Sequence, residues 1–236
     1  MNKRESQKKL IIVGIFSIAM GFLEGIVVVY LRALYYPNGF AFPLTNIPAH
    51  IIRIELVREV STIIMLVSIG IIAGKNSIQK FAYFIYAFGV WDIFYYVALK
   101  IFLNWPPSLL TWDILFLIPI TWVGPVMAPV ICSLTMILLS YVIIFFNNKI
   151  EKIQSTEWLL IILGAISILV TYMWDFSKLI IEKGLLSQLN SLDTNSEFQK
   201  IVSEYVPVTF NWYLFGMGEL LILCAVALIF KRSRKG

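Results

Sequence analysis

FAYFIYAFGVWDIFYYVALKIFL, residues 81–103, carries only two charged side chains, Asp92 and Lys100. A helix needs about 20 predominantly apolar residues to cross the hydrocarbon core of a bilayer, and this stretch is long enough. The whole chain has the same character, with 59% hydrophobic and 14% charged residues, against roughly 45–50% and 25% in soluble domains. Long apolar runs favour helices over the short alternating segments of a β-barrel. We therefore expect an all-α, polytopic transmembrane helical bundle.

Apolar runs separated by turn-rich or charged connectors divide the chain into six expected transmembrane helices. Residues 1–236 are expected to form a single integral membrane domain with helices at about 10–34, 50–73, 81–103, 124–146, 158–181 and 208–230. Because 113–146 is too long for one comfortable crossing, we expect an outer interfacial or re-entrant segment near 104–124; the alternative is a seventh crossing. Residues 183–206 have a helical apolar rhythm, which predicts an outer amphipathic segment or else a solvated loop.

Lysine and arginine are concentrated at the chain ends and in short connectors, and this distribution indicates the orientation. Cytoplasmic loops of membrane proteins carry an excess of these residues. With six crossings, both chain ends share one side with Lys75, Lys80, Lys149 and Lys152, which predicts cytoplasmic N- and C-termini. A seventh crossing would nearly equalise the two sides. We expect a multi-pass protein of the cell membrane, which is the cytoplasmic membrane if the source is bacterial.

Three of the four aspartates directly follow a tryptophan, in the pairs Trp91-Asp92, Trp112-Asp113 and Trp174-Asp175. Neighbouring side chains on a helix point about 100° apart, so each aspartate can face a pocket while its tryptophan packs beside it. Trp112 and Trp174 suit the aromatic belt at a membrane interface. Trp91 lies too deep for that belt and is expected to line a pocket or to pack in the core. Asp113 is expected to be solvated.

Several ionisable residues lie within the apolar runs, where each costs at least about 2.5–3.5 kcal/mol on insertion scales. Such residues normally face the bundle interior or a wet cavity, so their gathering in the outer half of several helices predicts one shared polar pocket that opens outward. We predict catalytic roles for the carboxyls of Glu24, Glu55, Glu59, Asp92 and Glu219. We predict that the substrate is bound by Arg58, Trp91, Tyr95, Tyr96, Asp175 and Trp212.

Glu55, Arg58 and Glu59 share one face of the second helix, because residues three and four apart are neighbours on a helix surface. The guanidinium fork of Arg58 is expected to serve both of these carboxylates. The group either belongs to the pocket or is a structural ion-pair network that fixes the helix register. His50, the single histidine, is about 140° around the helix from Glu55 and is expected to be a snorkelling or capping residue.

No sequence motif names a reaction. The chain has no GxSxG, HExxH, P-loop or glycine-rich dinucleotide sequence, so neither a metal nor a cofactor can be assigned from it. Cys132 and Cys224 lie in apolar runs without metal-ligand spacing and are expected to be packing residues. The net charge of +5 serves membrane orientation, so no nucleic acid partner is expected.

The predicted pocket favours an enzyme that applies acid–base chemistry to a lipid-like or isoprenoid substrate, since a buried carboxyl can act as a general acid. Two alternatives stay open: a small-solute or proton-coupled transport or binding subunit, and a structural subunit of a membrane complex. The expected partners are membrane lipid, a small hydrophobic ligand, and a second copy of the chain or another subunit of a complex.

Overall fold

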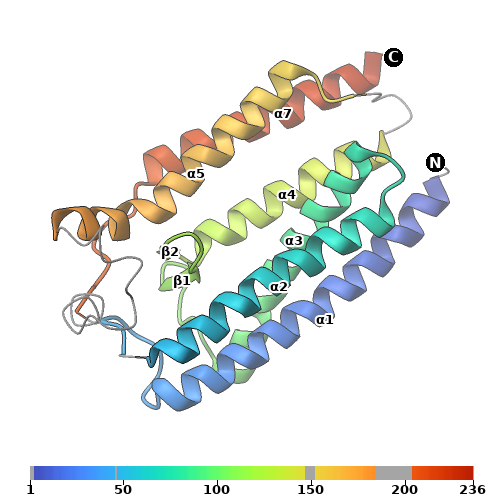
Figure 1. Ribbon diagram of the computed structural model, residues 1–236. Coiled ribbons are helices and arrows are strands. Elements are labelled where there is room, and N and C mark those ends of the chain that lie inside the picture. The colour runs from blue at the N-terminus through green and yellow to red at the C-terminus, as the bar shows by residue number, and fades with distance from the viewer. Residues whose placement is uncertain (1–2, 46, 147–151, 184–203, 236) are drawn as a thin grey trace.

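The computed structural model describes residues 3–45, 47–146, 152–183 and 204–235. Its helices are α1 (Lys3–Tyr35), α2 (Ala49–Ala73), α3 (Ser77–Leu103), α4 (Met127–Phe145), α5 (Ser155–Glu182) and α7 (Trp212–Lys235) (Figure 1). Within the described ranges, these six helices are long and apolar enough to cross a membrane. The expected all-α bundle with six transmembrane helices is therefore confirmed. The predicted amphipathic segment at 183–206 lies mostly outside the described residues.

Both chain ends lie at one end of the bundle, and a short β-hairpin lies toward the other (Figure 1). We call these the terminal end and the hairpin end. The hairpin consists of β1 (Trp112–Phe116) and β2 (Trp122–Pro125) and connects α3 to α4. The cytoplasmic location of the terminal end stays a prediction.

Two helices extend beyond their apolar runs because ion pairs hold their charged ends. Helix α1 begins at Lys3, well before the expected start near residue 10, and Glu5 in its first turns forms an ion pair of 2.8 Å with Lys75 after α2. Helix α7 continues past residue 230. There Arg232 donates to both carboxylate oxygens of Glu157 on α5, at 3.0 and 2.8 Å.

The helices pack as a group of four and a pair. In the group of four, α3 is central and packs on α1, α2 and α4; α5 and α7 form the pair, and α4 joins it to the group through α7. Helix α2 has its main contact on α3 alone, and it is not closely packed on α5. Figure 1 shows α2 and α5 on the same side of the bundle, separated from each other.

Most of the hairpin lies within the outer interfacial or re-entrant segment that we expected near 104–124. Its strands are antiparallel, with Asp113 opposite Gly124 and Ile114 opposite Val123. Pairing of the strands satisfies backbone N–H and C=O groups that have no helix to join, as the interior of a membrane protein requires. The region 113–146 therefore crosses the membrane once, through α4, and the hairpin packs against α4 and α5.

Two glycines bring α5 and α7 close together. A methyl group on Gly218 would lie 2.8 Å from the carbonyl oxygen of Gly164, and one on Gly164 would lie 2.6 Å from the carbonyl oxygen of Gly218. Small residues permit this close approach of two membrane helices. Gly216, two residues earlier on α7, has no atom within 4 Å of the corresponding position.

Replacing Gly218 with alanine should lower the stability of the protein by about 1–3 kcal/mol, because the added methyl group must push α5 and α7 apart. Gly216→Ala is the matched control on the same helix. It should leave stability unchanged or raise it slightly, since alanine favours a helix over glycine. Thermal unfolding of both variants in detergent tests this, and equal melting temperatures would contradict the close packing.

Candidate functional site

A cavity of about 600 Å³ lies between α2 and α5 and is backed by α3 and α4. We call it the central cavity. At the hairpin end it is bordered by residues of the hairpin, including Ile114, Phe116 and Trp122. At the terminal end its lining is apolar, with Phe81, Leu139 and Ile161. Both α2 and α5 contribute lining residues, and these two helices do not pack closely on each other.

The central cavity brings together nine of the eleven residues that the sequence singled out: Glu24, Glu55, Arg58, Glu59, Trp91, Asp92, Tyr95, Tyr96 and Glu219. Asp175 and Trp212 are not among its lining residues. Asp175 borders a smaller cavity of about 260 Å³ and accepts a hydrogen bond of 2.7 Å from Tyr205. Trp212 packs its ring against Phe210 and Phe215. A substrate-binding role for these two residues stays a prediction.

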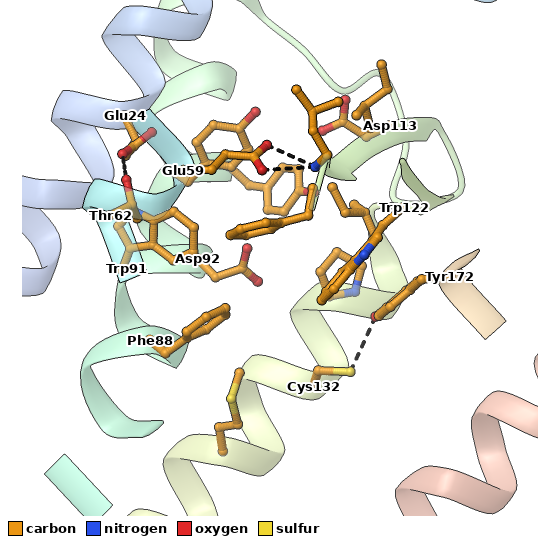
Figure 2. A pocket seen from close by; sticks show the side chains of 18 of the residues that line it. Glu24, Glu59, Thr62, Phe88, Trp91, Asp92, Asp113, Trp122, Cys132 and Tyr172 are labelled. Carbon is orange, nitrogen blue, oxygen red and sulfur yellow. Dashed lines mark hydrogen bonds between the residues drawn. The ribbon is translucent and has the colours of Figure 1, made fainter. Parts of the chain in front are cut away.

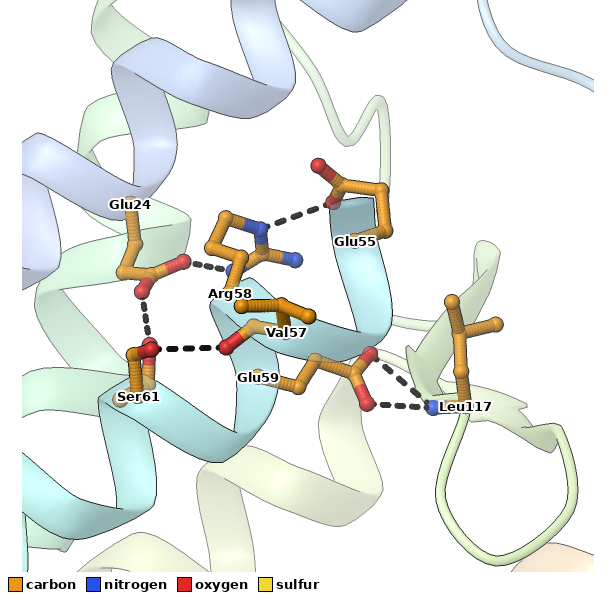
Figure 3. A network of polar contacts seen from close by, with 8 residues as sticks. Glu24, Glu55, Val57, Arg58, Glu59, Ser61 and Leu117 are labelled. Carbon is orange, nitrogen blue, oxygen red and sulfur yellow. Dashed lines mark hydrogen bonds and ion pairs between the residues drawn. The ribbon is translucent and has the colours of Figure 1, made fainter. Parts of the chain in front are cut away.

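Arg58 forms the centre of an ion network at the α2 side of the cavity. Its Nε donates to Glu55 at 2.8 Å, and its Nη1 contacts Glu24 on α1. Thr62 donates its hydroxyl to the other oxygen of Glu24. Figure 3 shows Glu24 and Glu55 on either side of the guanidinium. Because α1 and α2 make few other contacts, this network is a main connection between the two helices.

Glu59 does not share the guanidinium, which corrects the expectation that Arg58 serves both Glu55 and Glu59. Both carboxylate oxygens of Glu59 instead accept from the backbone N–H of Leu117, each at 3.0 Å (Figure 3). The reason is helical geometry, since Arg58 and Glu59 are consecutive and point about 100° apart. Glu59 therefore ties α2 to the loop of the hairpin.

Asp113 is buried, with 1% of its surface exposed, and the expectation that it is solvated was wrong. It accepts a hydrogen bond of 3.0 Å from Arg32 on α1. The guanidinium of Arg32 lies over the rings of Trp105 and Phe40, 3.8 and 4.4 Å from their centroids. Burial raises the pKa of Asp113 to about 6, and the positive charge of Arg32 acts in the opposite direction. At neutral pH the pair is therefore ionised and fixes β1 against the end of α1.

Asp92 lies within a curved row of five aromatic rings, which we call the aromatic arc. Successive ring centroids are 5.2, 6.5, 5.3 and 6.2 Å apart along the row Phe88, Trp91, Phe116, Trp122 and Tyr172. One carboxylate oxygen of Asp92 accepts a hydrogen bond of 2.7 Å from Ser133 on α4. Figure 2 shows this carboxyl pointing into the space between the rings.

Glu219 reaches the cavity from α7. Thr135 on α4 donates to its Oε2 at 2.7 Å, and its Oε1 is buried without a hydrogen-bond partner in the described part of the chain. Nearby on the same wall, the sulfur of Cys132 and the hydroxyl of Tyr172 are 3.3 Å apart (Figure 2). Cys132 thus lines the cavity and is not only a packing residue.

The carboxyls of the central cavity fall into two groups. Those of Glu24, Glu55 and Asp113 have ion pairs with Arg58 or Arg32. Those of Glu59, Asp92 and Glu219 accept hydrogen bonds from uncharged donors only, as far as the described residues extend. The donors of the second group orient these carboxyls but supply no compensating positive charge.

Sequence reasoning missed several cavity residues. The hydroxyls of Thr62 and Thr135 and the rings of Phe116 and Trp122 were not identified. Nor was Ser133, which donates to Asp92 without lining the cavity itself. The sequence signal that could have identified these hydroxyl residues is their position as polar residues within apolar runs. Within the described ranges, no three His, Cys, Asp or Glu side chains are grouped to hold a metal ion.

Comparison with known proteins finds no matching family model, no similar curated protein and no similar solved structure. The geometry of the central cavity is therefore the basis for assigning a function.

Replacing Arg58 with glutamine should destabilise the protein by about 3–5 kcal/mol, because it leaves the buried carboxylate of Glu24 and the partly buried one of Glu55 without their cation. Adding Glu24→Gln to that variant should restore part of the loss, since one uncompensated charge is removed. Unfolding in detergent measures both. Arg234→Gln is the control, because that guanidinium lies over Phe230 at an exposed helix end. An Arg58 variant as stable as the wild type would show that the network does not hold α2.

Proposed function

We propose that this integral membrane protein is an enzyme that protonates a carbon–carbon double bond of an isoprenoid-type lipid, with Asp92 as the general acid. The observation that carries the proposal is the position of Asp92, a carboxyl without a cation partner among the described residues, within the aromatic arc. Burial disfavours the charged form of a carboxyl, so Asp92 can carry the proton that a general acid needs.

The walls of the cavity suit an apolar substrate. Aliphatic and aromatic side chains dominate the lining, and α2 and α5, which both border the cavity, do not pack closely on each other. The outward faces of both helices carry exposed apolar residues, such as Val57 and Ile64 on α2 and Ile162 and Ile166 on α5. In a membrane these faces contact lipid, so a lipid-like molecule can enter sideways from the bilayer without crossing water.

The reaction begins when the O–H of protonated Asp92 adds its proton to one carbon of the double bond. The neighbouring carbon becomes a carbocation, and Asp92 becomes a carboxylate. The faces of aromatic rings are negative and stabilise a cation, which is the role we assign to the aromatic arc. A proton then leaves an adjacent carbon for the Asp92 carboxylate, which restores the acid. The net result is an isomerised or cyclised lipid that has the same molecular formula as the substrate.

The other predicted catalytic carboxyls have different roles in this proposal. Glu219, which also borders the cavity, is an alternative acceptor for the departing proton; Asp92 then regains a proton from solvent and Glu219 releases one. Glu59 positions the hairpin loop at the cavity, through Leu117. Glu24 and Glu55 hold Arg58 and so keep α2 in place. We place the hairpin end on the outer side of the cell membrane, following the distribution of positive charge in the sequence.

Proton-coupled transport is the second candidate, and the carboxyls of Asp92 and Glu219 without cation partners favour it, since such groups form proton relays in carriers. Against it, the lining toward the terminal end is apolar, with Phe81, Leu139 and Ile161. A carrier would need a polar path through that end.

Turnover in deuterated water tests the proposed enzyme. The protein in liposomes is supplied with polyprenyl alcohols, carotenoids or isoprenoid quinones, and mass spectrometry measures deuterium in new C–H bonds. The wild type should label one of these classes, because the proton that Asp92 adds comes from solvent. Asp92→Asn should lower the rate by about 100-fold or more, in line with the usual contribution of a general acid.

Glu182→Gln is the control variant, because Glu182 is solvent-exposed at the end of α5 and pairs with Lys178. Its labelling rate should equal that of the wild type. Labelling that Asp92→Asn leaves intact would overturn the role of Asp92. Absence of labelling in all three classes, together with proton uptake that depends on Asp92, would favour the carrier instead.

A further inference from the structure

We propose that the central cavity binds amphiphilic organic cations, with the positive centre of the ligand beside Asp92 and Glu219 and inside the aromatic arc. The apolar tail would lie toward the terminal end of the cavity. This inference goes beyond the proposed catalysis, because binding of a stable ammonium ion needs no turnover.

The excess of acidic groups in the cavity lining is the first reason to propose a cationic ligand. Six carboxyls line it, from Glu24, Glu55, Glu59, Asp92, Asp113 and Glu219, against two guanidiniums from Arg32 and Arg58. Both guanidiniums are already paired. An ionised carboxyl in a low-dielectric interior is costly unless a positive charge compensates it. The remaining three carboxyls must therefore carry protons or share the cavity with a cation.

The carboxyl of Glu219 independently indicates that a ligand binds in the cavity. The side chain is 6% exposed, and Thr135 satisfies only one of its two oxygens. Its Oε1 is buried and has no donor within the described part of the chain. Leaving a buried acceptor unsatisfied costs free energy that a suitable ligand would recover. Since the residue borders the cavity, a ligand there can supply positive charge to this carboxyl.

The aromatic arc decides between an organic cation and a metal ion. Aromatic faces attract quaternary ammonium groups, and cages of such rings with nearby carboxylates recognise them. Sodium, calcium or magnesium would need several oxygen ligands at close range to replace their water. In the described residues, no three His, Cys, Asp or Glu side chains lie close enough together to hold a metal ion.

The shape and polarity of the rest of the cavity call for a tail on the cation. Beyond Asp92, toward the terminal end, the lining consists of apolar side chains: Phe84, Ile85, Met136, Leu139, Ile161 and Ala165. Burial of alkyl groups against such walls contributes about 0.8 kcal/mol per CH₂. An alkylammonium amphiphile matches both ends of the cavity, whereas a small hydrophilic cation matches only one.

A pair of probes that differ only in charge tests this inference. Decyltrimethylammonium and its neutral isostere, in which carbon replaces the ammonium nitrogen, are titrated into the protein in a non-ionic detergent. Quenching of tryptophan fluorescence, with Trp91 and Trp122 at the site, reports binding. The cation should bind the wild type at least about tenfold more tightly than the neutral probe, as a desolvated cation–π contact with a carboxylate nearby allows.

Substitutions separate the charge from the shape of the cavity. Asp92→Asn and Glu219→Gln should each weaken cation binding by about tenfold and leave binding of the neutral probe unchanged. Phe116→Leu removes one ring and keeps the wall apolar, so it should weaken binding of the cation alone. Glu182→Gln should bind both probes as the wild type does. Size-exclusion chromatography confirms that each variant is folded.

Equal affinity for the two probes, or cation binding that survives Asp92→Asn, Glu219→Gln and Phe116→Leu, would overturn the inference. Displacement of the cation by millimolar sodium or calcium would also count against it, in favour of a metal ion. Binding of the cation without deuterium labelling of any lipid would leave this inference standing while the proposed catalysis fails.

Discussion

A carboxyl group that lies in hydrocarbon must find a hydrogen-bond donor inside the protein, and the architecture of this bundle follows from that constraint. Five carboxyls find their donor on a different element. Glu24 on α1 uses α2, Glu59 on α2 uses the hairpin loop, and Asp92 on α3 and Glu219 on α7 both use α4. Asp113 on β1 uses α1. The same bonds that satisfy the acids therefore connect the helices around the cavity.

This arrangement separates acids that are ion-paired from acids that accept hydrogen bonds from uncharged donors. A guanidinium compensates the charge of a carboxylate, as for Glu24 and Asp113, and breaking such a pair would leave a charge buried alone. A hydroxyl donor gives orientation without charge, as Ser133 does for Asp92. In the function that we propose, the first kind holds the walls of the cavity, and the second kind, at Asp92 and Glu219, is open to a ligand.

The number of crossings and most of the cavity acids could be predicted from the sequence because both are properties of a single apolar run. The length of the apolar run at 81–103 indicates a membrane crossing, and Asp92 is recognised as the acidic residue within it. The partners could not be predicted in this way. Arg32 and Asp113 are 81 positions apart, and threonine or serine in a membrane helix is too common to identify a specific donor. The hairpin was missed because its strands are only five and four residues long.

The recurrent Trp-Asp dipeptide shows why a local pattern cannot by itself assign a role. On α3, Trp91 and Asp92 both border the central cavity, one as a ring of the aromatic arc and one as the carboxyl inside it. On β1, successive side chains point to opposite faces, so Asp113 turns inward to Arg32 while Trp112 packs on Phe210. On α5, Trp174 is 62% exposed and Asp175 bonds to Tyr205 outside the cavity. The dipeptide is the same in each case. The secondary structure that carries it, together with its depth in the bundle, decides whether the acid accepts from a hydroxyl beside the cavity, pairs with a guanidinium or lies outside the cavity.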